Sequence, residues 1–547
     1  MLVTRRSFLK TTAGALALAA TGSLRRAASA APGARRPNVL LILADDMGFS
    51  DAKCYGGDIR TPNLSALAAG GLRFTQHYST GRCWPSRATI LSGFYAQSIR
   101  RDAMPGIKLG RRPAWAPLLP EMLKPLGYSC YHSGKWHIDG PPADGGFDRS
   151  WGGQRSGCDW DRYFDSKPWT EEGVTAPVEP GRPYYSTVAI ADHAIGCLDL
   201  HAKNHPGKPF FQYVAFYSPH FPLHAMQKDI DRYRDAYLKG WDWVRQSRWR
   251  RMKKMGIVNT PLSKRQPDIV PSWNLKPEQL KKRIGPGEAA FAVAWDSLSE
   301  QQKEFQAAKM AVHAAMITRM DLEIGRIVAR IKEMGQFENT LILFASDNGA
   351  SAEQIIRGDG HDPGAPIGSA KTFLCLGPGF STAANTPLRL HKHWNHEGGI
   401  SSPLIVHWPA RISARGELRH NPSHFVDIAP TILEIAGGTW PDEVKGAKVP
   451  ARPGRSLVPV FERDHTVAHD CLWWCHAGNR AIRIGDWKLV SRSGRDRQWE
   501  LYDLSTDRAE MNDLAEKHPE KAALMARKWN SLADDFRERL AASAAPG

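Results

Sequence analysis

The chain has 547 residues, of which 42% are hydrophobic and 24% are charged. This composition excludes a disordered protein, and the length is sufficient for a large buried core with more than one subdomain. The formal net charge is +17, which favours anionic partners electrostatically without specifying which ones.

The first thirty residues differ from the rest of the chain. The run Thr4-Arg5-Arg6-Ser7-Phe8-Leu9-Lys10 precedes a short apolar stretch, Ala13 to Ala20, and Ala28-Ser29-Ala30 offers an A-x-A cleavage site. This order is typical of a twin-arginine signal peptide over residues 1–30, and its apolar stretch is too short to span a bilayer. The alternative is a chance arginine pair before a weakly hydrophobic terminus.

No later stretch of the sequence reaches transmembrane length. We therefore expect a soluble protein without a membrane anchor, exported by the twin-arginine machinery to the bacterial periplasm or outside the cell. Its charge stays strongly positive after cleavage, because residues 1–30 contain basic residues and no acids.

Four apolar runs end directly before polar clusters. They are Val39 to Leu43 before Asp45-Asp46, Tyr128 to Tyr131 before Gly134-Lys135-Trp136-His137, Phe210 to Phe216 before Ser218-Pro219-His220, and Leu341 to Ala345 before Asp347-Asn348. Continuous apolar runs suit strands that helices cover on both faces, and ligands collect beyond the carboxyl ends of such strands. The sequence therefore predicts an α/β fold with one shared site at this edge of the sheet.

A helix is expected to begin beside Cys83. Pro85 suits the first turn of a helix whose body is Ser86 to Ser92. The backbone amides and dipole of that helix favour an anion next to residue 83. Arg87 lies one turn further on.

Residues 227–300 form a distinct region rich in tryptophan and basic residues. They include Trp241, Trp243, Trp249, Trp273, Trp295, Arg248, Arg250, Arg251, Lys253 and Lys254. Bases interleaved with aromatic residues could grip a sulfated sugar chain or nucleic acid. A solvated amphipathic helix packed by its tryptophans is the favoured interpretation.

The following stretch, Gln302 to Gly335, carries methionine and isoleucine at helical spacing, which indicates a core-packing helix that ends at Gly335. From about residue 441 the chain becomes rich in proline and glycine. Strand-like pieces follow at 481–484, 487–490 and 500–504, with a helical pattern over 518–540. We expect a main domain over 37–440, containing the 227–300 insert, and a C-terminal subdomain over 441–547.

The cysteines do not predict a disulfide framework. There are eight, and with Cys83 set apart the remaining seven cannot all pair. Scattered buried thiols are the ordinary expectation for a chain of this size. In C-L-W-W-C, Cys471 and Cys475 either pair or flank a strand.

The run C-W-P-S-R-A-T-I-L-S-G, which begins at Cys83, resembles the signature of the type I sulfatases of the alkaline phosphatase superfamily. The matching positions are Cys83, Pro85, Ser86, Arg87, Leu91 and Gly93. Further family-like segments are G-K-W-H at 134–137, P-H-F-P at 219–222, P-L-R-L-H-K at 387–392 and E-G-G at 397–399. In the C-terminal part, G-D-W-K-L-V and E-L-Y-D-L resemble the family's small subdomain, an antiparallel sheet with a helix.

The resemblance implies an α/β/α sandwich with a large mixed, mainly parallel sheet and a small C-terminal α+β subdomain. It also implies that a formylglycine-generating maturase oxidises Cys83 in the cytoplasm, before export of the folded protein. Asp45, Asp46, Asp347 and Asn348 would bind calcium together with the modified Cys83, since hard oxygen ligands hold a divalent cation that polarises sulfate. Sequence does not separate calcium from magnesium, and zinc is disfavoured because this set has no histidine or thiolate.

Carried over to this sequence, the family mechanism assigns a role to each remaining motif residue. Hydrated formylglycine 83 attacks sulfur, and Asp347 accepts or orients its proton. Arg87, Lys135 and Lys392 stabilise the sulfate oxygens. His220, assisted by Lys392, protonates the departing alcohol, and His137 then helps to expel sulfate from a sulfo-enzyme intermediate.

Some positions depart from the family pattern or stay open. Phe94 replaces a basic residue that is common after the signature, and Cys475 and Ala477 replace two acids of a segment seen as E-H-E-G-N-R in related bacterial sulfatases. An anion contact from position 94 is therefore expected to be absent, and any substrate contact from positions 475 and 477 is in doubt. For His224, His391, His393, His396 and His476, substrate-pocket and structural roles are both open.

The expected function is hydrolysis of an aryl or carbohydrate sulfate ester, with a sulfated saccharide favoured as substrate over nucleic acid. The nearest rival is a phosphonate monoester or phosphodiester hydrolase of the same superfamily, which can use the same modified cysteine. A non-catalytic glycan-binding protein is a more distant alternative.

Overall fold

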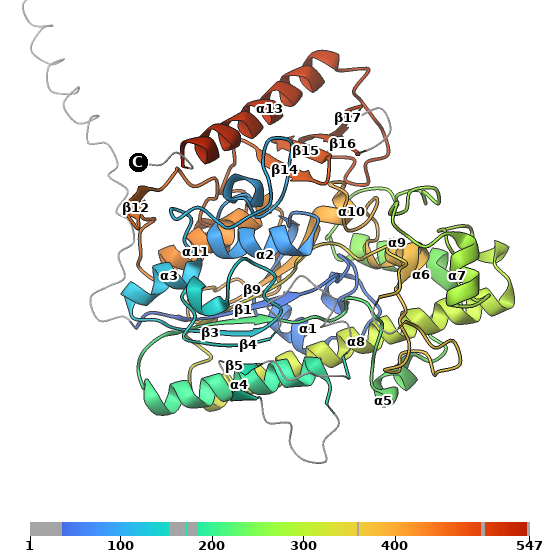
Figure 1. The fold of residues 1–547 in the computed structure, drawn as a ribbon, viewed down its shortest axis with the longest axis horizontal. Coiled ribbons are helices and arrows are strands. Elements are labelled where there is room, and N and C mark those ends of the chain that lie inside the picture. The colour runs from blue at the N-terminus through green and yellow to red at the C-terminus, as the bar shows by residue number, and fades with distance from the viewer. Residues whose placement is uncertain are drawn as a thin grey trace, which may run out of the picture. The chain divides into compact units, whose positions relative to one another are not determined.

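The computed structural model describes residues 35–152, 163–164, 170–171, 174–175, 184–357, 360–493 and 498–543. The predicted signal peptide, residues 1–30, lies outside the described residues. Residues 36–547 form one compact unit (Figure 1). The division into subdomains at about residue 441 stays a prediction.

A nine-stranded mixed sheet, counted over the described residues, forms the centre of this unit, in the order β10-β2-β9-β8-β1-β7-β3-β4 with β11 beside β2. The strands are β1 Asn38–Ala44, β2 Leu72–Tyr78, β3 Ser129–Gly134, β4 Arg149–Trp151, β7 Phe210–Ala215, β8 Thr340–Ser346, β9 Ser401–His407, β10 Glu417–Arg419 and β11 Ser423–His424. All neighbours are parallel except β9, which is antiparallel to β2 and β8. The predicted mainly parallel sheet is confirmed.

Helices cover both faces of the sheet (Figure 1). The helices of the described residues are α1 Pro62–Ala69, α2 Cys83–Ser92, α3 Leu119–Leu123, α4 Ser186–Asn204, α5 Gln227–Ile230, α6 Gly240–Lys254, α7 Pro277–Arg283, α8 Glu300–Glu333, α9 Gly377–Ala384, α10 Glu397–Ile400, α11 Ile428–Ile435, α12 Val458–Glu462 and α13 Pro519–Ala542. Short 3-10 helices lie at Lys53–Tyr55, Ala96–Ile99, Lys124–Leu126, Pro142–Gly145, Asp231–Tyr233, Trp295–Ser297 and Phe425–Asp427.

The alternation of strand side chains divides the apolar interior into two cores. In β1, Leu40 and Ile42 belong to the core under α4 and α8, whereas Val39, Leu41 and Leu43 belong to the core under α2, α3 and α11. Because successive side chains of a strand point to opposite faces, the apolar run 39–44 of β1 contributes to both cores. This explains why the run has no polar alternation.

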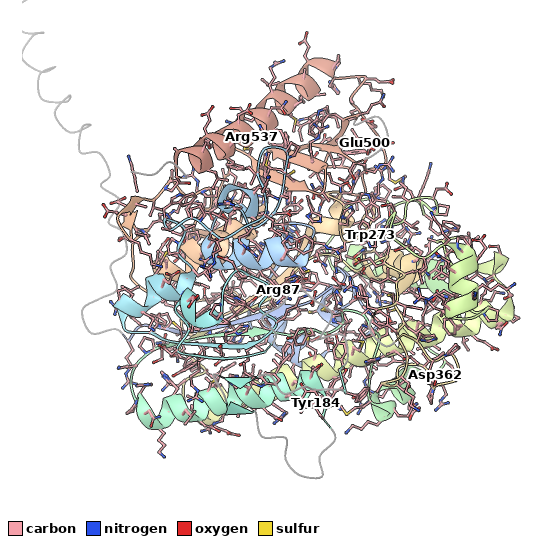
Figure 2. The ribbon with its side chains drawn as sticks, in the orientation of Figure 1. Arg87, Tyr184, Trp273, Asp362, Glu500 and Arg537 are labelled. Carbon is pink, nitrogen blue, oxygen red and sulfur yellow. The ribbon has the colours of Figure 1, made fainter. Side chains whose placement is uncertain are left out.

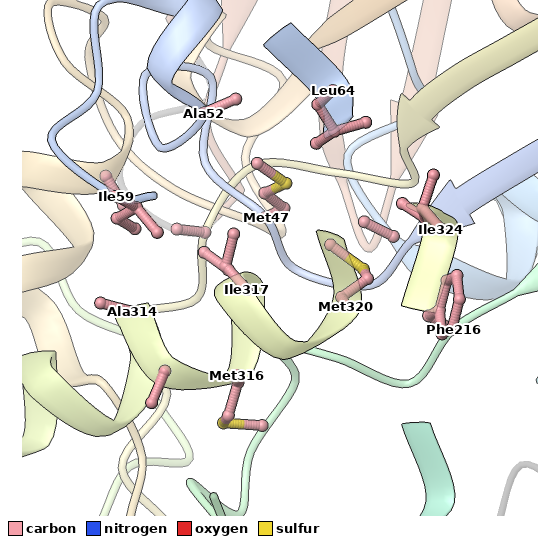
Figure 3. Close-up of a cluster of buried hydrophobic side chains, with 14 of the residues drawn as sticks. Met47, Ala52, Ile59, Leu64, Phe216, Ala314, Met316, Ile317, Met320 and Ile324 are labelled. Atoms are coloured by element: carbon pink, nitrogen blue, oxygen red, sulfur yellow. The ribbon is translucent and has the colours of Figure 1, made fainter. Parts of the chain in front are cut away.

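The long helix α8 packs on one of these cores, as its methionine and isoleucine spacing predicts. Its side chains Ile317 and Met320 lie against Met47, which follows β1 (Figure 3). Ser299 begins the helix as an N-cap that accepts a hydrogen bond from the Gln302 amide at 3.2 Å. Gly335, with φ of +66°, follows its end, as predicted.

The C-terminal part contains a four-stranded antiparallel sheet and the helix α13, in agreement with the predicted fold class. The strands are β14 Leu472–His476, β15 Asn479–Ile484, β16 Trp487–Ser491 and β17 Glu500–Asp503. Trp474 and Val490 of this sheet pack with Tyr78 of β2. The two-stranded sheets β5 Thr170–Glu171 with β6 Val174–Thr175, and β12 Glu443–Val444 with β13 Ala447–Lys448, lie outside these layers.

Cys471 and Cys475 are both free. Cys475 belongs to β14 and Cys471 directly precedes it. Four residues of extended chain span about 13 Å, which exceeds the roughly 7 Å limit for the Cα atoms of a disulfide. Of the two alternatives, the strand interpretation therefore holds.

Among the helices that the structure describes, none is both long enough and apolar enough to cross a membrane.

Candidate active site

The topology brings the four predicted polar clusters together. The strands β8, β1, β7 and β3 are consecutive neighbours and run parallel. Their carboxyl ends therefore share one edge, where Asp347 follows β8, Asp45 follows β1, His220 follows β7 and Lys135 follows β3. The predicted segment 387–392 reaches the same edge of the sheet, because the Nζ of Lys392 lies 2.7 Å from the Oδ1 of Asp46.

Arg87 joins the segments from within α2 (Figure 2). Its Nε and Nη2 donate to the Oδ2 of Asp347 at 3.0 and 2.7 Å, and its Nη1 donates to the Lys135 carbonyl at 3.0 Å. Ser86, in the same turn, donates from its Oγ to the Asp347 carbonyl at 2.5 Å. The first turn of α2 therefore fixes the loops after β8 and β3 relative to residue 83.

The predicted metal ligands form a buried group of oxygen atoms. The Nδ2 of Asn348 donates to the Oδ1 of Asp46 at 2.6 Å, and the Asp46 amide donates to the Oδ1 of Asp347 at 3.3 Å. Lys135 pairs with the Oδ2 of Asp45, and Arg87 lies 3.7 Å from the same oxygen. Within the described part of the chain, Asp45 Oδ1 and Asn348 Oδ1 are buried with no hydrogen-bond partner.

The charges of this group also fit a bound cation. Burial and the neighbouring Asp45 raise the pKa of Asp347 to about 7, and burial raises the pKa of Asp46. Burial would also raise the pKa of Asp45, but Lys135 and Arg87 outweigh it and lower that pKa. Buried oxygens without partners and carboxylates that resist ionisation fit an oxygen-coordinated divalent cation.

One part of the sequence argument about the metal does not hold. Zinc was disfavoured because the ligand set lacked histidine, yet ligand atoms of Asp45, Asp46 and His220 lie within 4.8 Å of one another. A nitrogen ligand is therefore within reach of the site. The case for a hard cation rests instead on the unpartnered oxygens of Asp45 and Asn348.

Cys83 is the first residue of α2 and is 3% exposed. Burial raises the pKa of its thiol, although Lys135 and Lys392 act in the opposite direction. A neutral thiol is a poor nucleophile, since the thiolate is the reactive form. The environment of residue 83 therefore does not activate an ordinary cysteine.

The two predicted acid–base histidines are held in neutral form. Burial, with Lys392 and Lys135, keeps the pKa of His220 well below its usual value. Burial, with Lys135 and Arg87, does the same for His137. The Nδ1 of His220 lies 2.6 Å from the Phe221 carbonyl, which can only accept. That nitrogen therefore carries the proton, and the Nε2 faces Asp46 at 3.7 Å.

Four of the nine non-glycine residues with positive φ among the described residues lie at or near this site. Asp46, His137, Leu390 and His393 have φ values of +67°, +57°, +65° and +90°. Each left-handed non-glycine residue costs roughly 1–3 kcal/mol and persists only where the surroundings impose it. Sequence gives no indication of these conformations.

Comparison with known proteins identifies the family. The family model described as Sulfatase matches residues 37–438, and a second model, described as N-sulphoglucosamine sulphohydrolase, C-terminal, matches residues 389–538. The chain belongs to the sulfatase family. It is a type I sulfatase of the alkaline phosphatase superfamily, as its signature indicates.

This sulfatase is similar to relatives in yeast and bacteria. It is 31% identical to an uncharacterized sulfatase of Schizosaccharomyces pombe, over 89% of this chain and 91% of the relative. It is 30% identical to an arylsulfatase of Klebsiella aerogenes, over 74% of this chain and 87% of the relative. A solved structure described as a complex with its substrate D-glucosamine-2-N,6-O-disulfate shares the fold, with a TM-score of 0.59, 22% identity and coverage of 92% and 99%.

The sulfatase site contains an acid that the sequence analysis missed. Glu353 accepts from Arg82 at 3.3 Å and from the Trp273 indole at 2.9 Å, and it lies 3.6 Å from Lys392. Burial alone would raise its pKa, but Arg82 and Lys392 outweigh burial and lower the pKa far below its usual range. A single glutamate in a loop has no sequence pattern that could have revealed this position.

Aromatic and cationic side chains surround the approach to residue 83. We name this group the aromatic rim, and it consists of Arg82, Trp84, Trp273, His393 and His476. Trp84 also contacts the catalytic candidate His137, with ring centroids 5.6 Å apart. Two of the histidines whose roles were open, His393 and His476, belong to this group.

The other three histidines have structural partners. The Nε2 of His224 bonds to the Thr372 carbonyl at 2.7 Å, His391 pairs with Ser381 at 2.7 Å, and His396 pairs with Glu500 at 3.1 Å. Phe94 is buried among apolar residues. The position therefore makes no anion contact, as its identity predicts.

The tryptophan-rich insert divides into a packing part and a rim part. Trp241 and Trp295 are buried, and Arg248 pairs with Asp51 and Asp58 at 2.7 and 2.6 Å. Arg250, Lys253 and Lys254 are exposed on α6. The structure thus favours the packing interpretation of this helix, and of the insert's tryptophans named above Trp273 is the one that belongs to the rim.

Proposed function

We propose that this sulfatase hydrolyses an aryl or carbohydrate sulfate ester with residue 83 in the formylglycine form and a divalent cation, calcium, at the oxygen cluster. The observation that carries the proposal is the position of Cys83. It lies at the start of α2, among Lys135, Lys392 and Arg87, with a thiol whose pKa is raised rather than lowered. Such surroundings suit an anionic substrate and an oxidised side chain better than a thiolate.

The residues fit both groups. Asp45, Asp46, Asp347 and Asn348 would hold the cation, and residue 83 would reach it from α2. When present, the hydrated aldehyde supplies a hydroxyl that attacks sulfur, and the cation supplies positive charge to the sulfate oxygens.

Binding of the sulfate group falls to the cations of the site. Lys135, Lys392 and Arg87 are buried and paired with carboxylates. Side chains held in this way are already oriented before substrate arrives and need little reorganisation during reaction. We assign them to the sulfate oxygens.

Proton transfer falls to the two histidines and Asp347. His220 keeps its Nδ1 proton through the Phe221 carbonyl, so its Nε2 takes up a second proton from solvent when the substrate anion binds and then gives that proton to the leaving alcohol. Lys392 and Lys135 help to hold the pKa of His220 down. Negative charge on the bound sulfate group offsets their charge, so the pKa of His220 rises when substrate binds. Asp347, whose pKa is raised to about 7, is suited to accept or orient the proton at residue 83, and His137 is assigned to the step that releases sulfate.

The test is peptide mass spectrometry of purified, active enzyme made together with a formylglycine-generating maturase. The peptide with residue 83 is expected to carry an aldehyde, and sulfate release from an aryl sulfate is expected to rise with the aldehyde fraction. Rates on an aryl phosphate diester provide the control for the rival activity. Full turnover with an intact thiol at residue 83 would refute the proposal, and a large preference for the diester would favour the rival.

We also propose export by the twin-arginine route to the periplasm, on the basis of Arg5-Arg6 and the A-x-A site. Replacement of Arg5 and Arg6 by lysine is expected to retain the enzyme in the cytoplasm, as cell fractionation would show. Unchanged export of that variant would contradict this assignment.

A further inference from the structure

The aromatic rim forms a continuous chain of contacts. The Arg82 guanidinium lies 5.3 Å from the Trp84 ring centroid and 5.7 Å from that of Trp273. From Trp84 the contacts continue to His476 at 5.3 Å, to His393 at 5.2 Å and back to Trp273 at 4.7 Å. The five side chains thus form a closed ring of contacts. Two of them, Arg82 and Trp84, are the sequence neighbours of Cys83.

The rim extends from the reaction centre to the surface. Cys83 is 3% exposed, Arg82 and Trp84 are half-buried, and Trp273 is 41% exposed. The half of a substrate that departs as the alcohol must extend from the sulfate site toward solvent. The rim therefore lies where the leaving group has to be recognised.

Two carboxylates hold the rim in place. Glu353 accepts from both Nη atoms of Arg82 and from the Trp273 indole. Asp102 accepts from the Nδ1 of His476 at 2.8 Å and from the Trp84 indole at 3.3 Å. Glu353 therefore holds Arg82 and Trp273 in position, and Asp102 holds Trp84 and His476.

The hydrogen bonds to Glu353 and Asp102 determine which groups of the rim remain available to a ligand. Because its Nδ1 proton is committed to Asp102, His476 presents its Nε2. The Arg82 charge is matched by Glu353, and burial lowers the pKa of His393 to about 3. The rim therefore presents aromatic faces, the Nε2 of His476 and an arginine whose charge is matched, a combination that suits ring C–H surfaces and hydroxyl groups.

We propose that the aromatic rim is the leaving-group pocket and that it takes the pyranose ring of a sulfated sugar, with His476 hydrogen-bonded to one of its hydroxyls and Trp273 covering one face. This inference rests on the proposed function. It goes further in naming the substrate class and the residues that select it. Buried polar groups of this kind reject ligands that lack the matching hydroxyl, because those groups would be left unpaired.

The test compares two substrate classes in the same variants. The probes are a small aryl sulfate, 4-methylumbelliferyl sulfate, and a panel of monosulfated hexoses. For Trp273→Ala and His476→Ala we expect KM for the preferred hexose sulfate to rise by about tenfold or more. The rise should exceed the fall in kcat, and it should exceed by several-fold any rise in KM for the aryl sulfate, which has no hydroxyls to lose.

Conservative variants and a matched control separate recognition from folding. His476→Gln keeps a side-chain hydrogen-bonding group and should recover part of the hexose-sulfate KM, and Trp273→Phe should recover part of the stacking. Trp243→Ala is the control, because Trp243 is 47% exposed on α6 in the same insert and packs against Lys239. It should change KM for neither substrate.

Three results would overturn the inference. They are equal losses on both substrates, no change in hexose-sulfate KM in either alanine variant, and a wild-type enzyme that cleaves the aryl sulfate but none of the hexose sulfates. Each leaves the proposed function intact, because wild-type turnover of the aryl sulfate remains. If the wild-type enzyme with an aldehyde at residue 83 hydrolyses no sulfate ester, the proposed function itself fails.

Discussion

Two buried charge clusters lie in this sulfatase, and their chemistry differs. The first is the oxygen cluster at the carboxyl edge of the main sheet. The second, which we name the C-terminal charge cluster, consists of Glu397, Lys488, Arg508 and Glu510 and lies between the C-terminal sheet and the loop that carries Lys392. Both are buried and both join segments far apart in the chain.

In the C-terminal charge cluster, Glu397 has donors on both oxygens. Lys488 donates to its Oε1 at 3.0 Å, and Tyr78 and Arg508 donate to its Oε2 at 3.1 Å. Burial would raise the pKa of Glu397, but Lys488 and Arg508 lower it from 4.5 to about 2. Glu510, which shares Lys488, has a pKa raised to about 7 because of burial and the charge of Glu397.

The oxygen cluster also contains carboxylates with a raised pKa, but its oxygens differ in their partners. Asp45 and Asn348 keep oxygens without partners among the described residues, and the pKa of Asp347 is raised to about 7 although Arg87 binds it. Burial of charge therefore does not by itself mark a functional site. The distinguishing observation is that Asp45 and Asn348 keep oxygens without partners beside residue 83, whereas in the C-terminal charge cluster donors reach both oxygens of Glu397 and Lys488 lies 2.8 Å from the Oε1 of Glu510.

The largest effect is expected for a substitution at residue 83, which should abolish turnover and leave the stability of the fold nearly unchanged. Cys83→Ala should lower kcat by about 10⁶-fold, as loss of a nucleophile does elsewhere. The free energy of unfolding should change by no more than about 1 kcal/mol, because a small buried side chain is replaced by a smaller one. Sulfate-release assays and urea denaturation measure the two quantities, and a strongly destabilised variant would contradict the separation of the two clusters.

The second prediction concerns the stability of the fold, which a substitution in the C-terminal charge cluster should lower. Glu397→Gln should lower the free energy of unfolding by about 3–5 kcal/mol at pH 7, since it leaves Lys488 and Arg508 without a full counter-charge. The folded pKa of Glu397 lies below its unfolded value. Its contribution is therefore complete above pH 4.5 and is lost as the pH falls toward 2.

Urea denaturation of wild type and variant at pH 7 and pH 3 checks this sign, since the difference between them should shrink at the lower pH. Glu333→Gln is the control, because Glu333 forms an exposed pair with Arg330 and should contribute less than about 1 kcal/mol. Equal effects of the two substitutions would show that the C-terminal charge cluster has no special role.

The third prediction concerns the cation. In chelated protein, added calcium should stabilise the folded state by about 2.7 kcal/mol when its concentration is a hundred times the Kd. The shift should be larger at pH 8 than at pH 5, because Asp347, with a pKa of about 7, must lose its proton to bind the ion. Thermal denaturation with and without calcium measures it.

Asp46→Asn sharpens this test. Asparagine tolerates the φ of +67° at this position, so the backbone should be retained. Because the substitution removes the carboxylate beside buried Lys392, the metal-free variant should be less stable than the metal-free wild type. The loss should stay below the roughly 3–5 kcal/mol of a fully unpaired buried charge, since Glu353 lies 3.6 Å from Lys392. The variant should lose most of the stabilisation by calcium, and its turnover should fall by at least about a hundredfold. A full calcium shift in this variant would remove Asp46 from the site.

The smallest effect is expected in the basic part of the insert. Replacement of Arg250, Lys253 and Lys254 by alanine should leave KM for a hexose sulfate unchanged and alter stability by less than about 0.5 kcal/mol. These side chains are exposed on α6, whose buried face holds Trp241 and Arg248. A large rise in KM would revive the substrate-binding interpretation of this helix.

Sequence predicted the parts of the fold in which local pattern and burial agree. The runs that became β1 and β8 are apolar throughout because both faces of each strand are covered, and α8 shows its spacing over its full length. β2 was missed because its sequence L-R-F-T-Q-H-Y is half polar. Its polar residues find buried partners from elsewhere, such as Ser423 for His77 at 2.9 Å.

The same distinction applies to the site. Short motifs and apolar runs in the sequence determined which residues carry sulfatase chemistry and that the carboxyl ends of four strands would bring them together. The tertiary structure alone decided which oxygens stay unpartnered, which backbone positions are strained, and that Glu353 and Asp102 brace the aromatic rim. The reason is physical, because these properties depend on distances between segments hundreds of residues apart, whereas a sequence pattern records the neighbours within one strand or one helical turn.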